Sequence, residues 1–241
     1  MTLAQFPEVV FYGRLGDQAL QMFNLSAELP ELRGRRVLDC PGGPGSLPAL
    51  LRSHGVEVTA VDPLYAMSAA ELRNRAAADL DLTIELSDLF QSLRPDFDLA
   101  GLRREHLDGL EQFLADFSSH PDTYVAASLP DLPFADASFE LVLSGHLLFS
   151  YAPIKDGGLM AGDGLDLAWH RKALAELCRV SSASVRLYPA HTMQRPVARH
   201  AYAEALLADL PSGWSGRFVA SSYDQGFVGC CEGLELVRAH R

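Results

Sequence analysis

Residues 41–45 form a glycine-rich turn whose composition suits the binding of a nucleotide. The turn, Pro-Gly-Gly-Pro-Gly, follows the apolar pair Val37 and Leu38 and precedes a predicted helix over residues 47–53. Glycines in such a turn let the backbone approach a ligand closely. Asp62 ends the next predicted strand, about 20 positions further on, where a carboxylate can bind the hydroxyls of a ribose. Together these residues predict the first half of a nucleotide-binding α/β unit.

His146 is the candidate for acid–base chemistry, because it follows the predicted central strand over residues 139–144. An unperturbed imidazole titrates near neutrality and can act as a general base. The structural alternative is that His146 caps the next helix or packs with its apolar neighbours. For His170, packing of a helix against the sheet is the favoured interpretation. Other candidates on later loops or strand ends are Tyr151, Tyr188 and His191.

The hydrophobic pattern predicts strands that alternate with helices. Strands are predicted over residues 37–38, 56–61, 123–127, 139–144, 185–188, 217–222 and 234–239. Helices are predicted over residues 17–29, 47–53, 65–80, 84–93, 102–117, 165–179 and 197–210. The last two strands have no helix between them, which indicates an antiparallel edge on a mostly parallel sheet. The prediction is one α/β domain over residues 1–241.

Residues 80–122 separate the helix after Asp62 from the next strand, which is long for such a connection. The segment has helix-like pieces that are interrupted at residues 94–96. Because long insertions in compact domains are often functional covers, we predict an inserted helical lid over 80–122. The alternative is a surface insertion without a function.

The composition of the chain limits the classes of partner that it is expected to bind. The net charge of −11 disfavours a nucleic-acid surface, which needs concentrated Lys and Arg. No uninterrupted apolar run is long enough for a membrane span, and no signal peptide is visible. The four cysteines lack metal-ligand spacing, so we expect no metal site and a reducing, cytoplasmic location. The expected partner is a small molecule, and the oligomeric state stays open.

Three blocks of the sequence, residues 37–45, 58–62 and 132–144, resemble the class I S-adenosylmethionine-dependent methyltransferases. The third block, with Leu-Pro-Phe before Ser-Phe-Glu-Leu-Val, is similar to a signature of the small-molecule branch. The resemblance extends over about residues 33–240, except for the stretch 80–122. It implies a Rossmann-like seven-stranded sheet and S-adenosylmethionine as the cofactor.

The resemblance also implies roles for individual residues. Gly43 and Gly45 would approach the methionine and ribose parts of the cofactor. Asp39 would accept hydrogen bonds from the turn or from the cofactor's ammonium group. Asp62 would bind both ribose hydroxyls.

The adenine ring would lie between Leu64 and Leu129. Ser128 occupies the position where the family commonly has an aspartate that touches the adenine amino group, so its contact would be weaker. Ser144, with Gly145, ends the strand that faces the methyl group in this fold, next to His146.

Pro41 departs from the family pattern, which has a glycine there. Proline fixes φ and provides no amide hydrogen, so we expect the turn to differ locally and Gly42 to supply the flexibility. Tyr12 and Arg14 are candidates to fold over the cofactor, with Arg14 near its carboxylate. An ordinary surface arginine is an equal alternative.

The sequence therefore predicts a methyltransferase that acts on a small molecule. The first alternative is a protein that binds the cofactor without turnover. The second is an NAD(P)-dependent oxidoreductase, which the prolines within the glycine turn disfavour, because they interrupt the dinucleotide-binding pattern.

Overall fold

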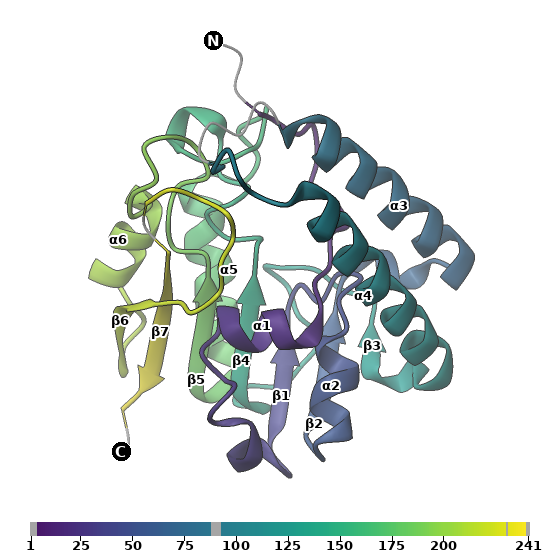
Figure 1. Cartoon of the computed structure of the whole chain (residues 1–241). Coiled ribbons are helices and arrows are strands. Elements are labelled where there is room, and N and C mark those ends of the chain that lie inside the picture. Colours follow the sequence, from purple (N-terminus) through teal and green to yellow (C-terminus); the bar gives the residue numbers. More distant parts are fainter. Residues whose placement is uncertain (1–3, 88–92, 230, 240–241) are drawn as a thin grey trace.

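The chain folds around one mixed sheet (Figure 1). The computed structural model describes residues 4–87, 93–229 and 231–239. The strand order is β3-β2-β1-β4-β5-β7-β6, which is the seven-stranded Rossmann-like sheet expected from the sequence. The strands are β1 (Arg36–Asp39), β2 (Glu57–Val61), β3 (Tyr124–Val125), β4 (Phe139–Gly145), β5 (Ser181–Tyr188), β6 (Trp214–Ala220) and β7 (Glu232–Arg238).

The sheet is parallel from β3 to β5 and antiparallel beyond it. β1 pairs in parallel with β2 and β4, with Leu38 opposite Thr59 and Val142. β7 is antiparallel to both β5 and β6, which confirms the predicted antiparallel edge. The central strands are buried on both faces, because helices cover both sides of the sheet.

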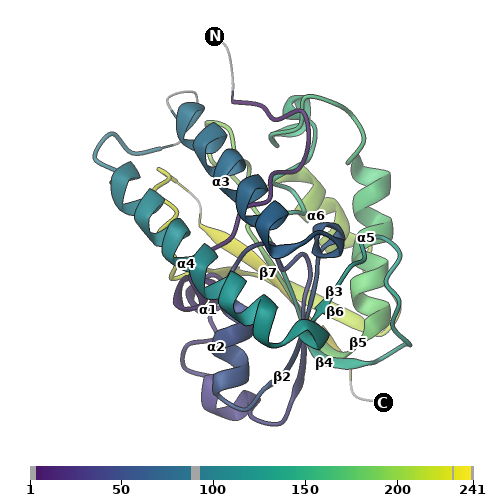
Figure 2. The same cartoon turned by 90° about the vertical axis from the view of Figure 1, so that its right-hand side faces the viewer.

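Helices form a layer on each face of the sheet. Figure 2 shows α1, α2 and α4 on one side and α5 and α6 on the other. Helix α3 runs beside α4, and the two are in extensive contact. The helices are α1 (Gly16–Met22), α2 (Leu47–Ser53), α3 (Ala69–Glu85), α4 (Leu99–Ser119), α5 (Leu167–Val180) and α6 (Ala201–Ala208).

Several predicted boundaries are wrong for local reasons. The helix expected over 17–29 ends at Met22, because Asn24 adopts a left-handed conformation with φ 53°. Helix α3 continues to Glu85, so no separate helix begins at residue 84, and residues 88–92 lie outside the described part. Strand β5 begins at Ser181, four residues earlier than predicted, where it pairs with Phe139.

The second half of α4 belongs to the body of the domain. Phe113 stacks on Tyr65, with ring centroids 5.8 Å apart, and meets the ring of Tyr124 edge-on at 5.5 Å. Asp116 forms an ion pair with Arg52 of α2. These contacts attach the second half of α4 to the edge of the sheet, and the lid over residues 80–122 stays a prediction.

None of the helices in the described part of the chain combines the length and the apolar character that crossing a membrane requires. Within the same residues, no group of three or more His, Cys, Asp or Glu side chains is arranged to hold a metal ion.

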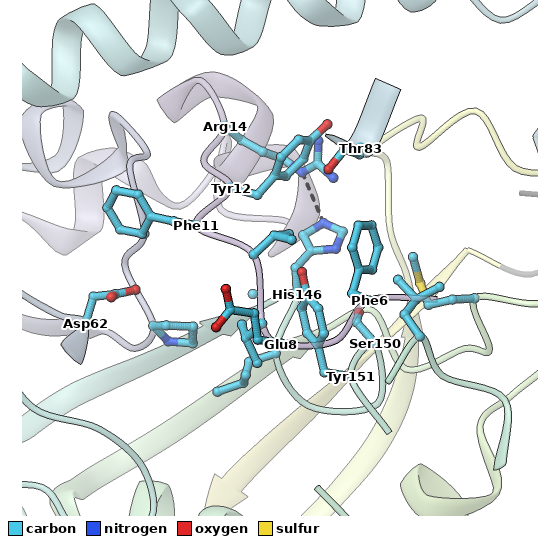
Figure 3. A pocket seen from close by; sticks show the side chains of 18 of the residues that line it. Phe6, Glu8, Phe11, Tyr12, Arg14, Asp62, Thr83, His146, Ser150 and Tyr151 are labelled. Atoms are coloured by element: carbon cyan, nitrogen blue, oxygen red, sulfur yellow. Dashed lines mark hydrogen bonds between the residues drawn. The ribbon is translucent and has the colours of Figure 1, made fainter. Parts of the chain in front are cut away.

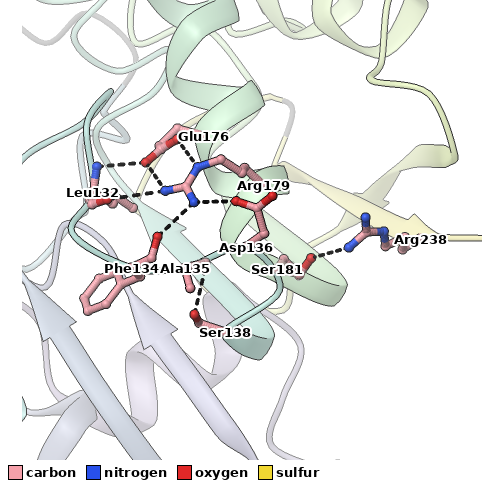
Figure 4. A network of polar contacts seen from close by, with 9 residues as sticks. All are labelled: Leu132, Phe134, Ala135, Asp136, Ser138, Glu176, Arg179, Ser181 and Arg238. Atoms are coloured by element: carbon pink, nitrogen blue, oxygen red, sulfur yellow. Dashed lines mark hydrogen bonds and ion pairs between the residues drawn. The ribbon is translucent and has the colours of Figure 1, made fainter.

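The turn over residues 132–138, which leads into β4, is held by the last part of α5 (Figure 4). The guanidinium of Arg179 donates to both carboxylate oxygens of Glu176, at 2.8 and 2.7 Å, and to Asp136 at 2.7 Å. It also donates to the carbonyl oxygen of Phe134 at 2.8 Å. Glu176 in turn accepts from the amide of Leu132 at 2.8 Å. One side chain thus sets the path of the turn.

Replacing Arg179 with alanine should lower the free energy of unfolding by about 2 kcal/mol, because several charge-assisted hydrogen bonds are lost together. Denaturant titration measures this loss. Arg171→Ala is the matched control: Arg171 also lies on α5, but its exposed partner Asp209 is 3.7 Å away. The control should change stability by less than about 0.5 kcal/mol. Equal losses of unfolding free energy in the two variants would contradict the role of Arg179 in holding the turn.

Candidate functional site

A cavity of about 460 Å³ opens where the parallel strands end (Figure 3). Its wall includes Cys40 after β1, Asp62 after β2, Ser128 beyond β3 and His146 after β4. In open α/β sheets this edge, at the carboxyl ends of the strands, is where ligands bind. Figure 3 shows Asp62 on one side of the cavity, His146 near its centre, and Phe6 and Tyr151 beyond His146.

The glycine turn is shaped by Gly43. This residue has φ 53°, a conformation that favours glycine, whereas Gly42 does not have a positive φ. The expectation that Gly42 supplies the flexibility is therefore wrong. Gly42 instead packs closely, because a Cβ there would lie 2.5 Å from the Tyr65 hydroxyl. That hydroxyl donates to the Gly43 carbonyl oxygen at 2.7 Å and holds the turn in place.

Two buried carboxylates stand behind the turn. Burial, together with the negative charge of the neighbouring Asp62, raises the pKa of Asp39 to about 8. Burial also raises the pKa of Asp62 to about 6, although the amides of Leu64 and Gly43 favour its charged form. Asp62 accepts from the Leu64 amide at 2.9 Å. Among the described residues no basic side chain forms an ion pair with Asp39. Of the two carboxylates, Asp62 faces the cavity and can accept hydrogen bonds from a ligand.

The structure brings most of the predicted site residues into one cavity. Residues that line it are Gly43, Asp62, Leu64, Ser128, Leu129 and His146. Asp39, Gly45 and Ser144 do not line it. Asp39 and Ser144 are buried at the ends of β1 and β4, and a Cβ on Gly45 would lie 3.2 Å from the Arg14 carbonyl oxygen. The roles predicted for all nine residues stay predictions.

Residues 11–16, which we call the N-terminal strap, pass directly over the glycine turn. The amide of Ser46 donates to the Arg14 carbonyl oxygen at 3.0 Å, and the Gly16 amide donates to the Ser46 hydroxyl at 2.9 Å. A Cβ on Gly13 would overlap the backbone of Pro44. The strap therefore forms part of the cavity wall and brings the side chain of Arg14 into it.

Arg14 and His146 meet inside the cavity, as the dashed line in Figure 3 shows. The Arg14 Nε–H donates to His146 Nε2 at 3.1 Å. Burial, together with the positive charge of Arg14, holds the pKa of His146 well below its usual value. The interpretation of Arg14 as an ordinary surface residue is therefore wrong. The general-base role of His146 stays a prediction, and its contact with Arg14 indicates a positioning role as well.

The other aromatic and histidine candidates separate into two groups. Tyr151 lines the cavity. His170 is buried, accepts from the Phe149 amide at 2.9 Å and does not line the cavity, which confirms its structural interpretation. Tyr188 is buried beneath the site. His191 lines a smaller neighbouring cavity of about 260 Å³.

Several cavity residues were missed by the sequence analysis. Glu8 precedes the strap, and Tyr223 and Phe227 come from the loop between β6 and β7. His106 of α4 does not line the cavity, but it contacts Arg14 and Tyr12, which do. The ring of Tyr12 lies 4.1 Å from that of His106. These residues are distant in sequence from the strand ends, and no local motif marks them, so only the folded chain brings them together.

Asp39→Asn should stabilise the ligand-free protein above pH 7. The native pKa of Asp39, about 8, is above the unfolded value, so the folded state binds the proton more tightly and stability falls as pH rises from about 4 to 8. Asparagine does not titrate, so the variant avoids this loss of stability. Thermal unfolding at pH 8 should show a midpoint roughly 3–8 °C higher.

Asp122→Asn, at an exposed site, should leave the midpoint within about 1 °C. If the stability of Asp39→Asn declines between pH 5 and 8 as much as that of the wild type, the buried carboxylate is not the source of this decline.

Comparison with known proteins supports the fold. No family model matches the sequence, and no curated protein matches it. Two solved structures of magnesium protoporphyrin IX methyltransferase from Synechocystis PCC 6803 are similar. The first, with bound S-adenosylmethionine, is 17% identical, with a TM-score of 0.50 over 93% of this chain and 80% of that one. The second, with bound S-adenosylhomocysteine, is 14% identical, with a TM-score of 0.51 over 93% and 84%. This chain has the fold of the class I S-adenosylmethionine-dependent methyltransferases.

Proposed function

We propose that this chain is an S-adenosylmethionine-dependent methyltransferase that acts on a small molecule beneath a helical lid. The observation that carries the proposal is the set of residues that share one cavity at the carboxyl ends of the strands. Gly43, Asp62 and Leu64 line it together with His146, Phe6 and Tyr151. The residues at the strand ends fit a nucleoside-like cofactor, and the rest of the cavity leaves room for an acceptor.

Asp62 is the carboxylate of the cavity wall that fits the cofactor. It accepts from the Leu64 amide at 2.9 Å, and in this proposal it also accepts from the ribose hydroxyls. The role toward the ammonium group belongs to Asp39, which is buried behind the turn and has no basic partner among the described side chains. When bound, the cofactor supplies an electrophilic methyl group. The protein's contribution is to align the acceptor with it and to exclude water.

The binding of S-adenosylhomocysteine to Asp62→Ala tests the cofactor assignment. Wild-type protein should bind this product in isothermal titration calorimetry, and Asp62→Ala should bind at least about 100-fold more weakly, because a charge-assisted bidentate contact is lost. Asp122→Ala is the control and should bind like the wild type. Unchanged affinity in Asp62→Ala would reject the assignment.

The lid belongs to the same proposal and involves the connection between α3 and α4. Ile84, Leu93, Phe97 and Leu102 line the cavity from this side. The segment after residue 92 is attached to the β6–β7 loop. Arg94 donates to both carboxylate oxygens of Asp224, at 2.9 and 2.8 Å, and its amide donates to the Gly226 carbonyl oxygen at 2.8 Å.

A charge exchange at this contact tests the lid. Arg94→Glu and Asp224→Arg should each raise the dissociation rate of S-adenosylhomocysteine by about 2–5-fold, because an exposed ion pair contributes about 1 kcal/mol or less. The double variant should restore the wild-type rate. Trp169, which lines the cavity, provides the fluorescence signal for stopped-flow measurement.

Arg217→Glu is the matched control, since it breaks a similarly exposed ion pair with Glu235 on β6 and β7. It should leave the dissociation rate unchanged. A double variant that dissociates as fast as the single variants would contradict closure through this ion pair.

A further inference from the structure

Arg14 is the one cation among the described cavity-lining residues that no carboxylate of the described chain neutralises. The charged residues in the wall are Glu8, Arg14, Asp62 and Arg75. Arg75 donates to Glu8 at 2.9 Å and to Asp79 at 2.6 Å, so this cation is paired. Asp62 is assigned to the ribose. Arg14 forms no ion pair with a carboxylate in the described part of the chain.

Neutral groups surround the Arg14 guanidinium. Its Nε donates to His146 Nε2 at 3.1 Å, and its Nη1 lies 3.4 Å from His106 Nε2. The rings of Tyr12 and Tyr223 lie 5.3 and 5.1 Å from its central carbon. Imidazole nitrogens and aromatic faces orient a guanidinium but do not neutralise it. The remaining N–H groups form a fork that suits a carboxylate.

The two histidines are held in the form that accepts from Arg14. His106 Nδ1 is 2.9 Å from the Leu102 carbonyl oxygen, so Nδ1 carries the proton and Nε2 faces the guanidinium. Burial and the charge of Arg14 lower the pKa of His106 to about 3. The Nε2 lone pair of His146 is likewise engaged. Next to Arg14, therefore, neither imidazole has a free basic nitrogen directed at an acceptor.

One wall of the cavity is mainly apolar. It is formed by a cluster of packed side chains, Phe6, Leu147, Tyr151, Leu159 and Met193. Ser150, which is 1% exposed, also lines it, and its hydroxyl has no hydrogen-bond partner among the described residues. An apolar acceptor that carries an anionic oxygen group would fill this space and pair with Arg14.

We propose that the acceptor is a largely apolar carboxylic acid, that Arg14 binds its carboxylate, and that this carboxylate receives the methyl group. The inference rests on the proposed methyltransferase function. A carboxylate oxygen attacks the methyl carbon in line with the carbon–sulfur bond. That bond breaks and its electron pair stays on sulfur, so an anion and a sulfonium become a neutral methyl ester and a neutral thioether. No proton moves, which matches a site without a free base.

The position of Arg14 favours the acceptor's carboxylate over that of the cofactor. Its guanidinium contacts His146, after β4, and Tyr223, in the β6–β7 loop. The groups assigned to the cofactor, Asp39 and Asp62, lie behind the glycine turn at β1 and β2. Because both carboxylates have the same chemistry, the experiment must separate them.

The test is calorimetry of protein loaded with S-adenosylhomocysteine, with naphthoate and the isosteric neutral naphthamide as probes. Wild-type protein should bind naphthoate at least about tenfold more tightly than naphthamide. Arg14→Gln should lose this preference, while its affinity for S-adenosylhomocysteine stays within about threefold of the wild type. Arg14→Lys should keep part of the preference, since it retains the charge without the fork.

Arg75→Gln is the matched control, because it removes a cavity cation that is already paired with carboxylates. It should keep the preference for naphthoate. Circular dichroism and thermal unfolding of each variant verify that it is folded. With a metabolite extract and methyl-labelled S-adenosylmethionine, the transferred label should be released as methanol by alkali, as expected of an ester.

Three results would overturn the inference. If Arg14→Gln weakens the binding of S-adenosylhomocysteine at least about tenfold, Arg14 binds the cofactor's carboxylate instead. Equal binding of naphthoate and naphthamide to the wild type would show that the acceptor site does not select an anion. A transferred label that is absent or stable to alkali would exclude carboxylate methylation. If S-adenosylhomocysteine does not bind the wild type at all, the proposed function itself fails, and this inference with it.

Discussion

The packing of the N-terminal strap against the glycine turn is the constraint on which the cavity depends. Gly13 approaches the Pro44 backbone so closely that no side chain fits between them, and Ser46 bonds to the strap through both its amide and its hydroxyl. At the other end of the strap, the Phe11 amide donates to the buried Asp79 of α3 at 2.6 Å. One short segment thus connects the turn to the helices beside it.

This packing explains why Arg14 lies in the cavity without a carboxylate partner. The strap brings Arg14 next to His146, after β4, and the strand ends place Asp39 and Asp62 at the turn. An unpaired buried charge is destabilising. For the two carboxyls, burial raises the pKa and so favours the neutral form, whereas the Arg14 guanidinium stays charged.

The sequence predicted the sheet well because its signals are local. Short apolar runs followed by Gly, Asp or Pro identified β1, β2 and β4, and helix α2 was predicted with its observed bounds. Predictions failed where a distant contact or a single backbone conformation decided the outcome. Asn24 ends α1 early, Gly43 rather than Gly42 carries the unusual φ, and the pairing with β4 extends β5 to Ser181.

The sequence by itself determined the fold class, the strand ends and the residues around the glycine turn, since periodicity and turn chemistry act over a few neighbouring positions. Only the tertiary structure decided which side chains surround Arg14 at this site. His106, Tyr223 and Arg14 are separated by about 90 to 210 positions and meet through packing, which no short-range pattern records. Their meeting adds to the predicted nucleotide site a cation that no carboxylate of the described chain neutralises.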